Sequence, residues 1–138
     1  MTVIDMQTMR YLNLLDQVSH VKTSKCFSHN NTVFFAVNRR DVSRAIGPGA
    51  VNVKKIQNSI GMKIRIIKEV KGVEEAKEFI ESIVSPVKIK SIEIKDSQII
   101  ITAGNNQNKA SLIGRNRRRE EELQRIVSDF FGLGVRII

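Results

Sequence analysis

The chain has 138 residues, with 23 lysines and arginines against 14 acidic residues, and its net charge is +9. This basic excess favours a polyanionic partner, most simply nucleic acid. The sequence has no run of about 18 apolar residues, which predicts no membrane span, and its N-terminus lacks the pattern of a signal peptide. The single cysteine, Cys26, excludes an internal disulfide and fits a reducing cytoplasm.

In chain order, the first half predicts a helix, a hairpin, two further helices and a strand. Apolar residues at helical spacing predict a helix over 5–18, with Asp5 as its N-cap. A loosely alternating stretch over 21–28, a turn at Asn30-Asn31 and the β-branched and aromatic stretch 32–37 predict the hairpin. Helices are predicted over 42–46 and from the following glycine loop to Ile60, before a strand over 62–70.

The second half predicts the same succession of elements. An amphipathic helix over 73–84 ends at Ser85-Pro86, because a residue before proline avoids helical angles. Strands are predicted over 87–94 and 99–102, helices over 109–113 and 120–131, and a last strand over 135–138.

A duplicated unit explains this succession. The segment 112–117 resembles 45–50 at an offset of 67 residues, and 135–138 resembles 64–67 at an offset of 71. The offset grows by 71 − 67 = 4 residues, about one helical turn, which predicts a longer last helix in the second copy. The predicted fold is α+β: two units, 1–72 and 73–138, each a three-stranded sheet packed against helices.

The segment after the first hairpin is the candidate binding site. Gly47 and Gly49 bracket Pro48, which interrupts the helix and leaves free amide N–H groups at the start of the next one. Such a helix start attracts phosphate, and Lys54 and Lys55 add positive charge beside it.

A hairpin followed by helix, glycine loop, helix and strand resembles a type II KH domain. The residues that carry the resemblance are Arg44-Ala45-Ile46-Gly47, Asn52-Val53-Lys54-Lys55-Ile56 and Gly61-Met62-Lys63-Ile64. Two such domains in tandem resemble the archaeal NusA-like transcription termination factors. The resemblance implies single-stranded RNA and RNA polymerase as partners in transcription elongation, pausing or termination. We also expect a monomer with no cofactor and, since no nucleophile is paired with a base, no enzymatic activity.

The resemblance also implies which residues bind RNA, since KH domains clamp about four nucleotides at the glycine loop. Ile46, Val53 and Ile64 are expected to form an apolar floor, or else to be plain core residues. The expected RNA-binding residues are Arg44, Ile46, Gly47, Pro48, Gly49, Ala50, Asn52, Lys54, Lys55, Arg65, Gly114, Arg115, Asn116, Arg117 and Arg118.

Both loops depart from the family's pattern of glycine at each end. Alanine stands at the fourth position of the first loop, Ala50, and arginine at that of the second, Arg117. The arginines around the second loop are interpreted either as replacement phosphate ligands or as a solvated face balanced by the glutamates that follow.

Two alternative functions remain open at this point. A helix-hairpin-helix motif would grip DNA phosphates, although it usually lies among helices rather than strands. A degenerate KH protein could instead dock on RNA polymerase or the ribosome without gripping RNA.

The sequence gives little support for a zinc site, a nucleotide-binding loop or a catalytic pair. His20, His29 and Cys26 do not make the four-ligand set of a structural zinc. There is no Walker loop and no identifiable pairing of a nucleophile with a base.

Overall fold

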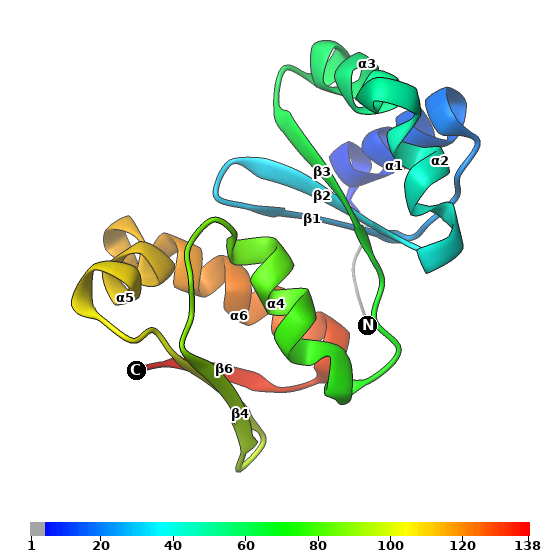
Figure 1. The fold of residues 1–138 in the computed structure, drawn as a ribbon. Helices are drawn as coiled ribbons and strands as arrows, with labels where there is room; N and C mark the ends of the chain where they lie inside the picture. Colours follow the sequence, from blue (N-terminus) through cyan, green and yellow to red (C-terminus); the bar gives the residue numbers. More distant parts are fainter. Residues whose placement is uncertain (1–4) are drawn as a thin grey trace. The chain divides into compact units, whose positions relative to one another are not determined.

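The structure is a computed structural model that describes residues 5–138. The expectation about a signal peptide falls largely on residues 1–4, which lie outside the described residues. The chain forms two compact units, Met1–Glu69 and Val70–Ile138. The α+β fold class predicted from the sequence is confirmed, because each unit contains a three-stranded mixed sheet packed with helices (Figure 1).

The first unit contains three α-helices and three strands within its described residues. Two short 3-10 helices precede α2 and α3. In chain order the elements are α1 Met6–Ser19, β1 Lys25–His29, β2 Thr32–Val37, η1 Arg39–Asp41, α2 Val42–Ile46, η2 Pro48–Ala50, α3 Val51–Ile60 and β3 Lys63–Lys68.

The sheet of the first unit has the order β1-β2-β3. β1 and β2 pair antiparallel across a turn at Asn30-Asn31, and both turn residues have positive φ. β2 and β3 pair parallel from Thr32↔Lys63 to Val37↔Lys68. This parallel pairing needs a crossover, which α2 and α3 supply.

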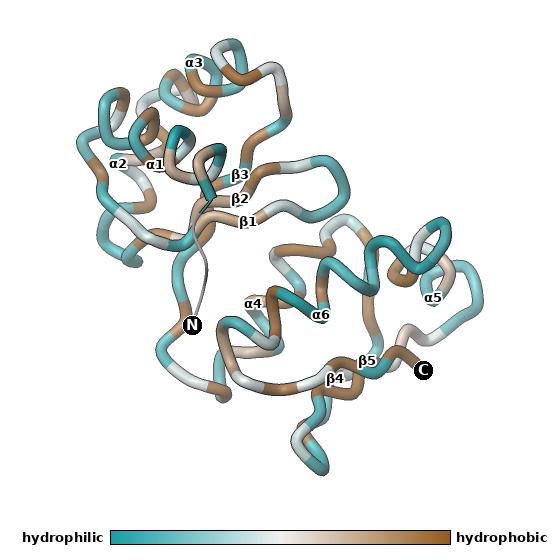
Figure 2. Tube along the Cα trace, turned by 180° about the vertical axis from the view of Figure 1, so that it is seen from behind, coloured by the Kyte–Doolittle hydropathy of each residue, from teal (hydrophilic) through white to brown (hydrophobic). Residues whose placement is uncertain are grey.

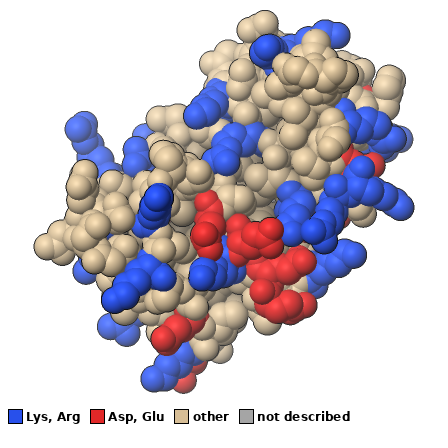
Figure 3. All heavy atoms as spheres, viewed as in Figure 1, with Lys and Arg blue, Asp and Glu red and all other residues tan. Residues whose placement is uncertain are grey.

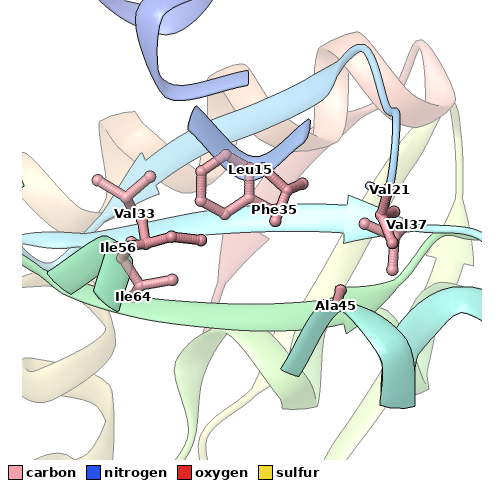
Figure 4. Close-up of a cluster of buried hydrophobic side chains, with 8 residues drawn as sticks. All are labelled: Leu15, Val21, Val33, Phe35, Val37, Ala45, Ile56 and Ile64. Carbon is pink, nitrogen blue, oxygen red and sulfur yellow. The ribbon is translucent and has the colours of Figure 1, made fainter. Parts of the chain in front are cut away.

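The core of the first unit lies between the sheet and its helices. Figure 4 shows Val33, Phe35 and Val37 of β2 pointing toward residues from α1, α2 and α3. Because strand side chains alternate, the intervening residues of β2 point to the other face of the sheet. The cluster consists of Leu15, Val21, Val33, Phe35, Val37, Ala45, Ile56 and Ile64, all buried.

The second unit repeats the architecture with the strand order β4-β5-β6. β4 and β5 pair antiparallel, and β5 and β6 pair parallel. Its elements are η3 Val73–Glu75, α4 Ala76–Val84, β4 Ser91–Lys95, β5 Gln98–Thr102, α5 Asn106–Ile113, η4 Arg115–Arg117, α6 Arg118–Phe131 and β6 Gly134–Ile137.

Helices α4 and α6 of the second unit are amphipathic, and hydrophilic and hydrophobic segments alternate along both (Figure 2). From α4, Phe79, Ile80 and Ile83 are buried, and Phe79 packs against Phe130 with ring centroids 4.7 Å apart. The opposite side of α4 carries glutamates, which gather over this helix on the face shown in Figure 3. This segment is therefore a core helix with a solvated acidic side.

Several element boundaries differ from the sequence prediction for identifiable reasons. The strand expected over 87–94 is confined to 91–95, because pairing with the short strand β5 begins at Ser91↔Thr102. Helix α5 begins at Asn106 rather than 109, because the side chain of Asn105 accepts a hydrogen bond from the Asn108 N–H at 2.7 Å and caps it. Helix α6 has 14 residues and α3 has 10, which confirms the predicted extra turn.

Candidate nucleic-acid interface

The first loop joins α2 to α3 through three residues of positive φ. Gly47, Gly49 and Ala50 have φ of +79°, +61° and +60°. The Gly47 N–H donates to Ser43 O at 2.9 Å and ends α2, and the Ala50 N–H donates to Gly47 O at 3.0 Å and closes the loop. The alanine at the fourth position thus takes the left-handed conformation that glycine adopts most easily.

The second loop, between α5 and α6, has the same backbone conformation. Gly114, Asn116 and Arg117 have φ of +75°, +56° and +60°. The Gly114 N–H donates to Ala110 O at 2.9 Å, and the Arg117 N–H donates to Gly114 O at 3.2 Å. The two loops therefore share one backbone path, with alanine in one and arginine in the other at the fourth position.

Both loops lead into a helix start that no side chain caps. Ala50 precedes α3 and Arg117 precedes α6, and neither makes a capping hydrogen bond with its side chain. The first amide N–H groups of an α-helix lack intrahelical partners, and they carry the positive end of the helix dipole. Part of this donor capacity is used inside the loops, because the Val51 N–H donates to Pro48 O and the Arg118 N–H donates to Arg115 O, and Pro48 itself has no N–H. The amides that follow in each first turn are the ones that the helix start offers to an anion.

In the first unit, the cations nearest to the loop in sequence lie on the two flanking helices. Lys54 and Lys55 are exposed on α3. Arg44 on α2 forms an ion pair with Asp41 at 3.1 Å, and its side chain remains 60% exposed. An ion pair this exposed contributes at most about 1 kcal/mol, so the guanidinium can exchange Asp41 for a phosphate.

In the second unit, the arginines near the loop fall into two groups. Arg115 and Arg118 are exposed, and within residues 5–138 their side chains have no ion-pair partner. The Nε of Arg117 donates to Glu120 Oε1 at 2.7 Å, and the Arg119 guanidinium donates to Ser111 O at 3.2 Å. Arg115 and Arg118 are therefore available as phosphate ligands, whereas the charge of Arg117 is balanced by a glutamate that follows.

The structure shows the surroundings of three further residues that were expected at the site. Arg65 lies on β3 with its guanidinium 5.6 Å from the centre of the Phe34 ring, on the sheet face opposite Phe35 and Ile64. Asn52 donates its amide to Arg44 O at 3.0 Å. Ile64, expected either as groove floor or as core, is 3% exposed and belongs to the core cluster, whereas Ile46 and Val53 are half-buried.

The sequence interprets Arg119 as one of the arginines that could replace phosphate contacts, and misses its hydrogen bond to the preceding helix. Its place 67 residues after Asn52 was a signal that the two residues are equivalent. Gln57 was also missed, and its side chain accepts a hydrogen bond from the Ile64 N–H at 3.0 Å, which ties α3 to β3.

The described residues give little support for a metal site or a reactive cysteine. Among residues 5–138, no group of three or more histidine, cysteine or acidic side chains is placed to hold a metal ion. Burial and, to a smaller extent, the negative charge of Asp5 raise the pKa of the Cys26 thiol to about 12, so this thiol stays protonated at neutral pH. None of the described helices is long and apolar enough to cross a membrane.

Comparison with proteins of known sequence finds distant relatives. The chain is 27% identical over 84 residues to the probable transcription termination protein NusA of Methanococcus vannielii, and equally to that of Methanocaldococcus jannaschii. The matched segment covers 61% of this chain and 47% and 44% of those two proteins, so the chain matches less than half of their length. No family model matches the chain.

Comparison with solved structures supports the fold over nearly the whole chain. The crystal structure of APE1850 matches with a TM-score of 0.65 and 24% identity, and the match covers 98% of this chain and 100% of that one. The predicted resemblance is thereby confirmed as a distant similarity to archaeal NusA proteins in sequence, accompanied by a two-unit α+β fold that APE1850 shares.

Proposed function

We propose that this chain binds single-stranded RNA through its two glycine loops and acts with RNA polymerase in transcription elongation or termination, in the cytoplasm. The observation that carries the proposal is that the same loop backbone, followed by an uncapped helix start, occurs in both units. The printed names of the two relatives support the link to transcription termination. We infer a binding role rather than catalysis, exercised by a monomer with two KH domains, 1–72 and 73–138.

In the proposed mechanism, each loop holds RNA phosphates and the side chains around it supply charge. The backbone of 47–50 and the lysines of α3 would bind phosphate in the first unit. The backbone of 114–117, with Arg115 and Arg118, would do so in the second. Binding should weaken as salt rises, with a slope of log affinity against log salt of about −0.7 for each phosphate that is neutralised.

The first loop is best tested with Gly49→Asp. A Cβ at Gly49 meets no atom within 4 Å, and its φ of +61° is one that aspartate tolerates, so the variant adds a carboxylate to the loop without a clash. Gly61→Asp is the matched control, because Gly61 is equally open, has φ of +72° and lies at the opposite end of α3. Gly47→Asp is less suitable, since a Cβ there would lie 2.9 Å from the Asn52 side chain.

The second loop allows a still smaller change, Asn116→Asp, which keeps the shape of the side chain and adds one negative charge. Asn106→Asp, at the exposed start of α5, is its control. A charge placed about 4 Å from a phosphate costs between about 1 and 4 kcal/mol, so each loop variant should weaken RNA binding about fivefold or more.

The measurement is a titration of short single-stranded RNAs at low and moderate salt. Salt-sensitive binding that is weakened by the loop variants and not by their controls would support the proposal. A loss confined to Asn116→Asp would move the site to the second unit. Absence of binding by the folded wild type would refute RNA recognition and favour the alternative of a docking module on RNA polymerase or the ribosome.

A further inference from the structure

One hydrogen bond recurs beside both loops, and it is made by chemically different side chains. In the first unit, Asn52 Nδ2 donates to Arg44 O at 3.0 Å. In the second, Arg119 Nη1 donates to Ser111 O at 3.2 Å. Both donors are the second residue of the helix after the loop, and both acceptors lie in the helix before it, so each bond joins the two helices across the loop.

The carbonyl that accepts this bond lies in the last turn of its helix. In an α-helix, the carbonyl of Arg44 would accept from the N–H of the residue four positions later. That residue is Pro48, which has no N–H. In the second unit, Gly114 with φ of +75° ends α5 at the equivalent place. A side chain arriving from the next helix therefore satisfies a carbonyl at the helix end.

The first glycine of each loop makes room for this side chain. A Cβ at Gly47 would lie 2.9 Å from Asn52 Cγ, and a Cβ at Gly114 would lie 2.8 Å from Arg119 Cγ, both too close for real atoms. At the third position of the first loop, by contrast, a Cβ on Gly49 would have no atom within 4 Å. Glycine at the first position therefore adopts the positive φ and also leaves space for the side chain that bridges the two helices.

We infer that Asn52 and Arg119 are positioning residues, each of which holds its glycine loop in the conformation that receives an RNA phosphate by bonding to the preceding helix. This inference rests on the proposed function, because it explains how the same two loops are held in shape. It moves Asn52 from the expected RNA contacts to a supporting position. It also implies that the charge of Arg119 serves no phosphate, since a neutral amide fills its role in the first unit.

The test compares two variants of Arg119 that both lose the charge. Arg119→Asn keeps a donor of the kind that the first unit uses, and Arg119→Leu has none. In the first unit, Asn52→Arg keeps a donor and Asn52→Leu has none. Circular dichroism first establishes that each variant is folded.

The first readout needs no RNA and is the hydrogen-exchange rate of the two amides that close the loops. These are the Ala50 N–H, bonded to Gly47 O, and the Arg117 N–H, bonded to Gly114 O. The leucine variants should speed exchange about three- to tenfold in their own loop, as expected for loss of one hydrogen bond. Arg119→Asn and Asn52→Arg should stay within about twofold of the wild type.

The second readout is RNA affinity and its salt slope. Arg119→Leu should weaken RNA binding about three- to tenfold, as it speeds hydrogen exchange. Arg119→Asn should preserve both the RNA affinity and its salt slope. Equal weakening by the two Arg119 variants, with a slope reduced by about 0.7, would make Arg119 a phosphate contact and overturn the inference. Unchanged loop exchange in both leucine variants would also overturn it. If the wild type binds no RNA, the proposed function fails, but hydrogen exchange still decides whether the two residues hold the loops.

Discussion

Replacing Ala50 by glycine should stabilise the first unit. Ala50 has φ of +60° at the last position of its loop. A non-glycine residue in this left-handed conformation costs about 1–2 kcal/mol, and glycine loses about 0.5–1 kcal/mol more conformational freedom on folding. The difference predicts a net stabilisation of about 0.5–1 kcal/mol, which corresponds to a rise in Tm of about 2–8 °C for a unit of this size.

Thermal unfolding followed by circular dichroism measures this effect, and Ala110→Gly provides the control. Ala110 is exposed inside α5, where glycine is less favourable than alanine by about 1 kcal/mol. Removing one methyl group should therefore raise Tm at position 50 and lower it at position 110. A decrease in Tm for Ala50→Gly similar to that for Ala110→Gly would refute the assigned loop conformation.

Three further predictions concern the first unit. Ile56→Ala, at a fully buried position of α3, should lower the free energy of unfolding by about 2–5 kcal/mol in a denaturant titration, and a loss below 1 kcal/mol would contradict the assigned core. Hydrogen bonds from the Thr8 backbone lower the pKa of Asp5, the N-cap of α1, so Asp5 adds stability above the ordinary pKa of aspartate, and this is lost as the pH falls through its folded pKa. The stability difference between wild type and Asp5→Asn should accordingly shrink in acid unfolding below about pH 4. Iodoacetamide at pH 8 should alkylate Cys26 about a hundredfold or more slowly in the folded than in the urea-unfolded protein, as measured by mass spectrometry, and equal rates would contradict its burial.

The fold was largely predictable because local signals and the repeat agreed. The apolar face of 73–84, the glycines that end α3 and α6, and the Asn30-Asn31 turn each indicated one element, and the second copy repeated their order. The boundaries that failed depend on a partner rather than on the local sequence. The stretch 87–90 has the composition of a strand, but the paired register with β5 begins at Ser91↔Thr102, and from this stretch the Lys90 N–H donates to Thr102 O at 2.8 Å.

The site was less predictable, because its residues act through contacts that spacing does not reveal. The backbone path of the loops could not be deduced from Gly-x-x-Gly, since alanine and arginine occupy left-handed positions that favour glycine. Arg65 is expected to neutralise phosphate, and the sequence did not indicate its contact with Phe34, on the sheet face opposite the core cluster. The hydrogen bond from Asn52 to Arg44 O joins two helices across the loop, and the spacing of these residues in the sequence does not indicate it.

The two loops share a backbone but carry their positive charge in different places. The first loop, 47–50, is uncharged, and its lysines follow on α3 at positions 54 and 55. In the second unit the loop itself carries Arg115 and Arg117, while the equivalent helix positions, 67 residues later, are Glu121 and Glu122. Under the proposed function, a strand held at the first loop finds cations along the adjoining helix. At the second loop, carboxylates on α6 repel the strand and confine phosphate contacts to the loop and its arginines. The two units thus share the loop geometry that is proposed to hold a phosphate, and the placement of charge distinguishes the path that RNA would take from each loop.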